Sequence, residues 1–180
     1  MNGQASIVGA SHTDFRSSFE SSKRWNPIIK RIVGPYLLRD STLVEDTTEA
    51  TDLIVLRAEG VRVACRVRNH NGGYASRYPW DITMTCQRET GSKCEWDKMI
   101  LGDLGDWFFY GHGNSSCDDI EHWFLVDLGI ARPYLRSGNW IKKGPNKDVP
   151  GKRCWFYAFN AQRFPISSAI IAQRVPVGSF

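Results

Sequence analysis

The sequence predicts a single α/β (α+β) domain in which helices flank a mixed β-sheet. Two segments, residues 61–68 and 80–88, alternate apolar and polar side chains with the period of two that is typical of strands. Two others, residues 14–38 and 92–110, place apolar residues at helical spacing. Helices embedded among strands indicate a layered domain. With 180 residues, 42% of them hydrophobic, the chain can bury a core without metal or disulfide staples.

Composition indicates the domain boundaries. It also gives the chain a small excess of positive charge. The small and polar residues 1–12 are expected to form a flexible tail, so that one globular domain covers residues 13–180. A net charge of +4 favours polyanionic partners only weakly. Five cysteines without C-x-x-C spacing, and no signal peptide, indicate reduced thiols in a cytoplasm. No apolar run reaches the roughly 18 residues of a membrane span, so no membrane association is expected.

The predicted first helix, residues 14–38, has two interruptions. Thr13 can cap its amino terminus. Pro27 predicts a kink or a break near Asn26, and Gly34 followed by Pro35 predicts the end of the helix.

A hairpin is predicted between residues 49 and 68. An apolar strand begins at Asp52, a turn follows at Glu59 and Gly60, and a second strand completes the pair. Alternation gives the second strand two distinct faces. One face carries Val61, Val63, Cys65 and Val67, and the other carries Arg62, Ala64, Arg66 and Arg68.

Further elements follow the hairpin. Residues 80–88 form a third strand whose polar face includes Asp81, Thr83 and Thr85. Ser92 and Glu95 have the spacing of a capping box, which predicts a helix from there to residue 110. Residues 122–126 and 154–159 are predicted as apolar strands, separated by a basic surface loop at residues 137–152.

This order of elements resembles the core of the PD-(D/E)XK nuclease superfamily, which includes restriction enzymes and Holliday-junction resolvases. The resemblance covers residues 14–127 and is similar in particular to small phage proteins with that core. It rests on a helix, a strand that begins with an aspartate, and a strand that ends in a charged pair two residues apart. The resemblance implies a restriction-endonuclease-like fold. In the family, acidic residues bind Mg²⁺ and a lysine orients the attacking water.

The carry-over of the family motif gives a degenerate site. Asp52 matches the family aspartate, and Glu20 lies where the first-helix glutamate is expected. Arg66 stands in place of the second acid, and Arg68 in place of the lysine. An arginine offers no lone pair to a cation. Asp81 can replace the lost acid, in which case Asp52 and Asp81 hold Mg²⁺ or Mn²⁺, and the catalytic residues are Asp52, Asp81, Arg68 and Glu20.

Three functions are therefore open. The first expectation is a catalytically weak or silent protein that binds DNA or RNA and needs no cofactor. The alternatives are an active Mg²⁺-dependent nuclease and a protein-binding inhibitor of a host complex. A phage-encoded protein of this kind acts in the host cytoplasm. The expected nucleic-acid contacts are Arg62, Arg66, Arg68, Trp140, Lys142, Lys143, Lys152 and Arg153.

Structural explanations compete with these functional ones. Arg66 and Arg68 can equally belong to a solvated sheet face. Trp140 either stacks on a base or folds back over the core. His112, Cys117 and His122 invite a zinc interpretation, but a structural zinc site usually has four ligands.

Overall fold

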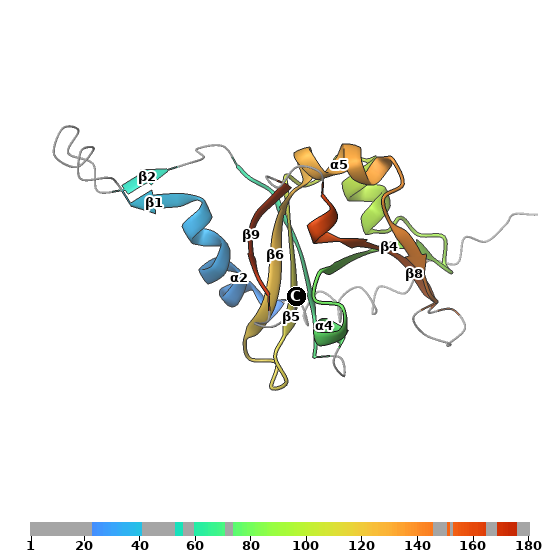
Figure 1. Ribbon diagram of the computed structural model, residues 1–180, viewed down its shortest axis with the longest axis horizontal. Helices are drawn as coiled ribbons and strands as arrows, with labels where there is room; N and C mark the ends of the chain where they lie inside the picture. Colours follow the sequence, from blue (N-terminus) through green and yellow to red (C-terminus); the bar gives the residue numbers. More distant parts are fainter. Residues whose placement is uncertain are drawn as a thin grey trace, which may run out of the picture.

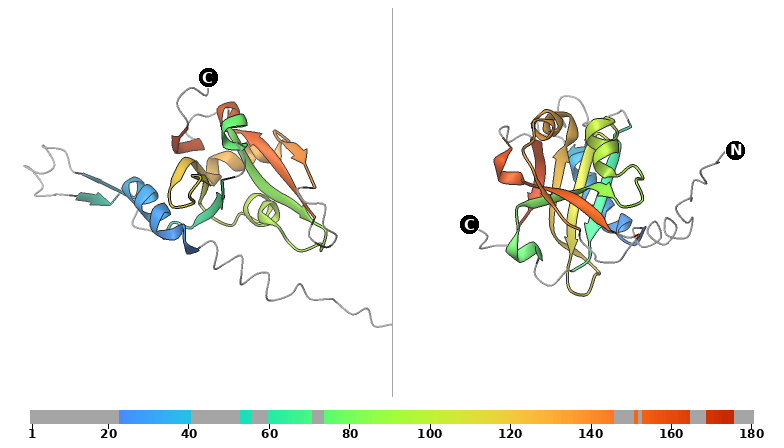
Figure 2. Two further views of the ribbon diagram at one scale, coloured as in Figure 1. Left: turned by 90° about the horizontal axis from the view of Figure 1, so that it is seen from below. Right: turned by 90° about the vertical axis from the view of Figure 1, so that its right-hand side faces the viewer.

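The computed structural model describes residues 23–40, 53–55, 60–70, 74–145, 151, 153–164 and 169–175. They form three layers, which are helix α2 (Asn26–Val33), a four-stranded sheet and a three-stranded sheet (Figure 1). Helix α5 (Leu128–Arg136) and the short helix η2 (Asp97–Leu101) lie at one end of the sheets (Figures 1 and 2). The α+β class is therefore confirmed. In the described ranges, no helix has the length and apolar character needed to cross a membrane.

The four-stranded sheet is mixed, as predicted. Its strands are β3 (Val63–Arg68), β5 (Trp107–Gly113), β6 (Ile120–Asp127) and β9 (Ile170–Arg174), in the order β3-β5-β6-β9. Strand β3 runs parallel to β5, while the other two pairings are antiparallel. Among the described strands β3 pairs only with β5, so β3 forms an edge of this sheet.

The three-stranded sheet is antiparallel throughout. It consists of β4 (Asp81–Arg88), β8 (Cys154–Asn160) and β7 (Ile141–Lys143), in the order β4-β8-β7. A register shift between Thr85 and Gln87 interrupts the pairing of β4 with β8. The smaller elements are η1 (Gly34–Tyr36), α4 (Tyr74–Arg77) and η3 (Ala161–Arg163).

One core lies between α2 and the four-stranded sheet. Trp25, Ile29 and Val33 recur at four-residue spacing, so they share one face of the helix. They belong to one buried cluster with Phe109 and Trp123 from β5 and β6. The break near Asn26 and the end near Gly34 are both confirmed, because Pro27 lies in the first turn of α2 and Gly34 is its C-cap.

A second core fills the space on the other face of this sheet. It joins side chains from both sheets with side chains from α5 and η2. Its fully buried members include Ile82, Met84, Ile100, Phe108, Phe124, Leu128 and Leu135. Since β5 has buried residues on both of its faces, it is the central strand of the domain.

The predicted hairpin at residues 49–68 is wrong. Strand β2 (Leu53–Val55) pairs with β1 (Leu38–Asp40), and this pair lies at the far end of α2, away from both sheets (Figure 1). The alternation in residues 61–68 predicts the faces of β3 correctly but not its partner. Alternation shows which side chains of a strand are buried, but any neighbouring strand with a matching apolar face can bury them, so the pattern does not identify the partner.

The predicted helix at residues 92–110 is also largely wrong. Only residues 95–101 are helical, and Asp103 and Gly105 then adopt positive φ angles of 54° and 80°. The apolar run that follows is strand β5, in which all seven residues are buried. A run that is apolar on both faces fits a buried helix and a central strand equally well, so its spacing misled the prediction.

Two histidines are enclosed in the second core. His112 and His122 are cross-strand partners on β5 and β6, with stacked rings whose centroids lie 5.4 Å apart. Burial, aided by His122 and Arg68, lowers the pKa of His112 to about 3. Burial also lowers the pKa of His122 to about 4, which the Pro79 backbone opposes in part. The described residues hold no group of three or more potential metal ligands, so the histidines gain no support as a zinc site.

These histidines predict an acid-sensitive fold. Both have pKa values depressed below about 6.5, so unfolding takes up protons as the pH falls below that value. Stability is therefore complete above pH 6.5 and declines toward pH 4, by up to about 2.7 kcal/mol per pH unit for two protons. Urea unfolding at several pH values measures this slope. We expect His122→Phe to remove roughly half of it. A slope equal to that of the original protein would contradict the assignment.

Candidate functional site

Three of the predicted site residues lie outside the described part of the chain. They are Glu20, Asp52 and Lys152. Their roles in catalysis, metal binding or nucleic-acid contact stay predictions. The other predicted residues fall on β3, β4 and β7 or directly beside β3, β7 and β8, and the structure gives each of them protein partners.

Arg66 links β3 to the neighbouring sheet. Its guanidinium donates to Thr85 Oγ1 at 2.9 Å and forms an ion pair with the Glu95 carboxylate. The backbone N–H of Thr85 donates to the same carboxylate at 2.8 Å. The side chains of Arg66 and Glu95 remain 21% and 31% exposed, so this polar connection borders solvent.

Arg68 lies between the two sheets and is half-buried. Its Nε donates to Thr83 Oγ1 at 3.1 Å and to the Tyr110 hydroxyl at 2.9 Å. These two oxygens also lie 3.0 Å apart, and Thr83 is fully buried. The Phe156 ring lies 5.8 Å from the guanidinium on the side of β8. Arg68 therefore joins three strands, and its Nε and one terminal nitrogen already have acceptors within the protein.

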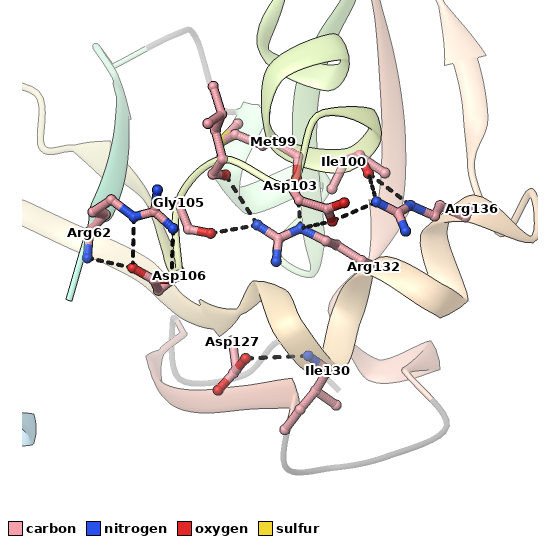
Figure 3. Close-up of polar contacts among 11 residues, drawn as sticks. Arg62, Met99, Ile100, Asp103, Gly105, Asp106, Asp127, Ile130, Arg132 and Arg136 are labelled. Carbon is pink, nitrogen blue, oxygen red and sulfur yellow. Dashed lines mark hydrogen bonds and ion pairs between the residues drawn. The ribbon is translucent and has the colours of Figure 1, made fainter. Parts of the chain in front are cut away.

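Arg62 has a partner at the entrance to β5. Its Nε and backbone N–H donate to Asp106 Oδ2 at 3.1 and 2.8 Å, and its terminal nitrogen donates to Oδ1 at 3.2 Å (Figure 3). These hydrogen bonds lower the pKa of Asp106 to about 2. The backbone N–H groups of Asp106 and Trp107 donate to the Arg62 carbonyl, so this contact sets the start of the β3–β5 ladder.

Helix α5 fixes the segment that leads into β5. Arg132 donates to the carbonyl oxygens of Met99, Leu104 and Gly105, and Arg136 donates to Ile100 (Figure 3). Asp103 forms ion pairs with both arginines. Arg132 and Arg136 thus bind five backbone or side-chain acceptors in η2 and in the segment that connects it to β5, which has little regular structure of its own.

Asp81 is not the carboxylate that the structure brings to Arg66. Its Oδ2 lies 3.3 Å from Lys143 Nζ across the three-stranded sheet. The acid beside Arg66 is Glu95, which sequence analysis had assigned to a capping box. Asp97 instead accepts from the backbone N–H of Cys94 at the start of the short helical segment. The turn after β4 brings Glu95 back beside Thr85. The spacing of residues in the sequence does not predict this contact.

The predicted basic loop is less free than expected. Lys142 donates to Gln87 at 2.8 Å, Lys143 pairs with Asp81, and Arg153 lies 4.0 Å from Glu89. Trp140 folds back over the core, which was the second of its two interpretations. Its Nε1 donates to the Leu135 carbonyl at 3.1 Å, and its ring packs on Tyr157 with centroids 3.6 Å apart. An exposed, base-stacking Trp140 is therefore not what the structure contains.

A groove opens where β3 ends, between α2 and β4. We call it the polar groove; it has a volume of about 380 Å³ and is lined by Asn26, Arg66, Asn69, Thr85, Arg88 and Glu95. Arg24 lies at its rim, donating to the Asn69 side chain, with its guanidinium carbon 4.8 Å from the Trp25 ring centroid. Alternation predicted Arg66 for such a site, whereas Arg88, at the end of the predicted third strand, and Glu95, in the predicted capping box, were not expected there.

The packing of Arg68 yields a matched test on β4. Thr83→Val should destabilise the protein by about 1–3 kcal/mol, because half-buried Arg68 and buried Tyr110 lose a shared partner. Thr85→Val should cost less, since Arg66 keeps Glu95. Chemical denaturation of both variants measures the difference in the free energy of unfolding. A larger loss for Thr85→Val would show that Arg66, and not Arg68, secures the contact between the sheets.

Comparison with known proteins adds no relationship to these observations. No family model, curated protein or solved structure matches this chain. The candidate site is therefore defined by its own geometry: a groove at the edge of β3 with more cationic than anionic side chains.

Proposed function

We propose that this protein binds DNA or RNA by seating phosphates in the polar groove, and that it acts in the cytoplasm. The observation that carries the proposal is the composition of that groove. Arg66 and Arg88 line it and Arg24 lies at its rim, while Glu95 is its single acidic lining residue among those described. Guanidinium groups match the geometry of phosphate oxygens, and the amides of Asn26 and Asn69 add neutral donors.

The proposal revises which arginines meet the ligand. Arg68 is engaged between the sheets and Arg62 is bound to Asp106, so both shape the site without facing it. Arg88 is exposed and has no ion pair among the described residues, which leaves its guanidinium available to a phosphate. Lys142, Lys143 and Arg153 lie on the other sheet, where each would have to exchange a protein partner for a phosphate.

A degenerate PD-(D/E)XK core is part of this proposal. Its support is the mixed sheet with α2 on one face and the side chains of Arg66 and Arg68 on the other. The described residues alone do not fit a Mg²⁺ site. Glu95 is held by Arg66 and Asp81 is held by Lys143, and the described part of the chain contains no group of three or more potential metal ligands.

Salt-dependent binding tests the proposal directly. Fluorescence anisotropy with a labelled single strand of about 16 nucleotides should show affinity that falls steeply with salt. Arg88→Ala should weaken binding similarly for all sequences and lower the salt slope by about one. Arg163→Ala, an exposed arginine on η3 that does not line the groove, is the matched control. Binding that ignores salt, or that both variants reduce equally, would remove the groove from consideration.

Turnover separates binding from the nuclease alternative. Because Glu95 and Asp81 are paired with cations, we expect the bound strand to survive incubation with Mg²⁺ or Mn²⁺. Gel analysis of labelled DNA and RNA measures cleavage. Metal-dependent cleavage that is lost in both Asp52→Ala and Glu95→Gln, but kept in Asp81→Asn, would instead establish an active nuclease with Glu95 as its second acid.

A further inference from the structure

The edge of β3 carries more than the polar groove. Two further hollows lie along it, one on each face of the strand, and Cys65 lines both of them as well as the polar groove. We propose that this edge docks an extended, acidic segment of a partner protein, which adds to the four-stranded sheet as a further strand.

The main chain of β3 is set up for such an addition. The Arg62 carbonyl accepts from Trp107 N–H at 3.1 Å, which starts the parallel ladder with β5. In a parallel ladder alternate residues bond to the same neighbour, so residues 62, 64, 66 and 68 direct their peptide groups toward β5. Val63, Cys65 and Val67 therefore direct theirs toward the outer edge. Among the described strands none occupies that edge, and Cys65 Sγ itself reaches the Val63 carbonyl at 3.6 Å.

Apolar hollows lie where the side chains of an added strand would point. The helix-side hollow, about 310 Å³, is lined by Ile29, Val33, Leu37 and Val63. The loop-side hollow, about 240 Å³, is lined by Ala64, Met99, Leu104 and Phe108. Successive residues of a strand point to opposite faces, so neighbouring residues of the added segment enter the two hollows. Main-chain bonds supply affinity in this mode and the hollows supply specificity.

Charge defines the chemistry of the occupant. Lys30 lines the helix-side hollow, Lys98 lines the loop-side hollow and Arg88 lines the polar groove. None of these three has an ion pair among the described residues, whereas Glu95 is already paired with Arg66. An acidic segment with apolar residues at its centre complements this edge. A second copy of the chain would bring the same lysines, Lys30 on α2 and Lys98 on η2, close to one another beside the edge, and their like charges oppose self-pairing.

The inference goes beyond the proposed function and does not depend on it. Nucleic acid is expected at the polar groove, where two arginines and two asparagines line the site, whereas the lining of the two hollows is mainly apolar with one lysine each. Both ligands would lie against Cys65, so they can compete, but different residues should control them. Arg88 governs the first ligand, and the outward N–H of residue 65 together with Leu104 governs the second.

A displayed library of random seven-residue peptides, panned on the full-length protein, is the probe. Enriched peptides should carry neighbouring apolar residues flanked by aspartate or glutamate. Synthetic copies should bind Cys65→Val as tightly as the original protein and Cys65→Pro at least tenfold more weakly. Proline removes only an outward N–H here, and edge strands tolerate it at such positions.

Further variants keep the test decisive if Cys65→Pro fails to fold. Leu104→Asp, at a side chain that is 51% exposed, should abolish peptide binding, whereas Ile141→Asp, at one that is 65% exposed on β7, should not. Nucleic-acid binding by the same variants, measured at several salt concentrations, tests the polar groove separately. It shows whether the peptide proposal or the nucleic-acid proposal has failed. Three results would overturn the inference: no enrichment, peptides that bind Leu104→Asp and Cys65→Pro normally, or a dimer of the protein that Leu104→Asp dissociates.

Discussion

The hydrogen bonding of the half-buried Arg68 guanidinium between the two sheets is the constraint on which the rest of the structure depends. A cation taken out of water destabilises a fold by several kcal/mol unless its donors find acceptors. Arg68 finds them in Thr83 on β4 and Tyr110 on β5. The hydroxyl of Thr83 must therefore face β3, which fixes how β4 sits on the larger sheet. Arg66 and Thr85 repeat the arrangement two residues away, where solvent begins and the polar groove opens.

Local patterns in the sequence predicted much of the secondary structure. Alternation identified β3 and β4, including the separation of Val63 from Arg66, and proline and glycine marked both ends of α2. Partners were not predictable in the same way. Strand β3 bonds to β5, which follows much later in the chain, and the apolar run of β5 has no spacing that distinguishes a strand from a buried helix. Which strands pair depends on which apolar surfaces the other elements leave uncovered, and these surfaces are seen only in the folded chain.

For the candidate site, the sequence likewise predicted the faces on which side chains lie but not the residues that they contact. Arg66 and Arg68 were correctly placed on one face, but whether a buried arginine meets a phosphate or a threonine depends on the neighbouring sheet. Glu95 was assigned to a helix cap because Ser92 precedes it at the right distance, yet its carboxylate reaches across to β4 and β3. Arg88 and Leu104, which now carry the two binding proposals, are ordinary surface residues in the sequence. Their importance comes from lying beside an open strand edge.

The parallel pairing of β3 with β5 has a consequence for how the protein is made. Arg62 and its partner Asp106 are separated by 44 positions, and β4 and η2 lie between them. At about 5–20 residues per second, a ribosome needs roughly 2–9 s to extend the chain from Arg62 to Asp106. During this interval β3 has neither its ladder partner nor the sheet that accepts its arginines. Contacts of such long range also slow folding, because the loop must close before they form. The apolar valines of β3 are thus the part of the nascent chain that most needs protection from premature association.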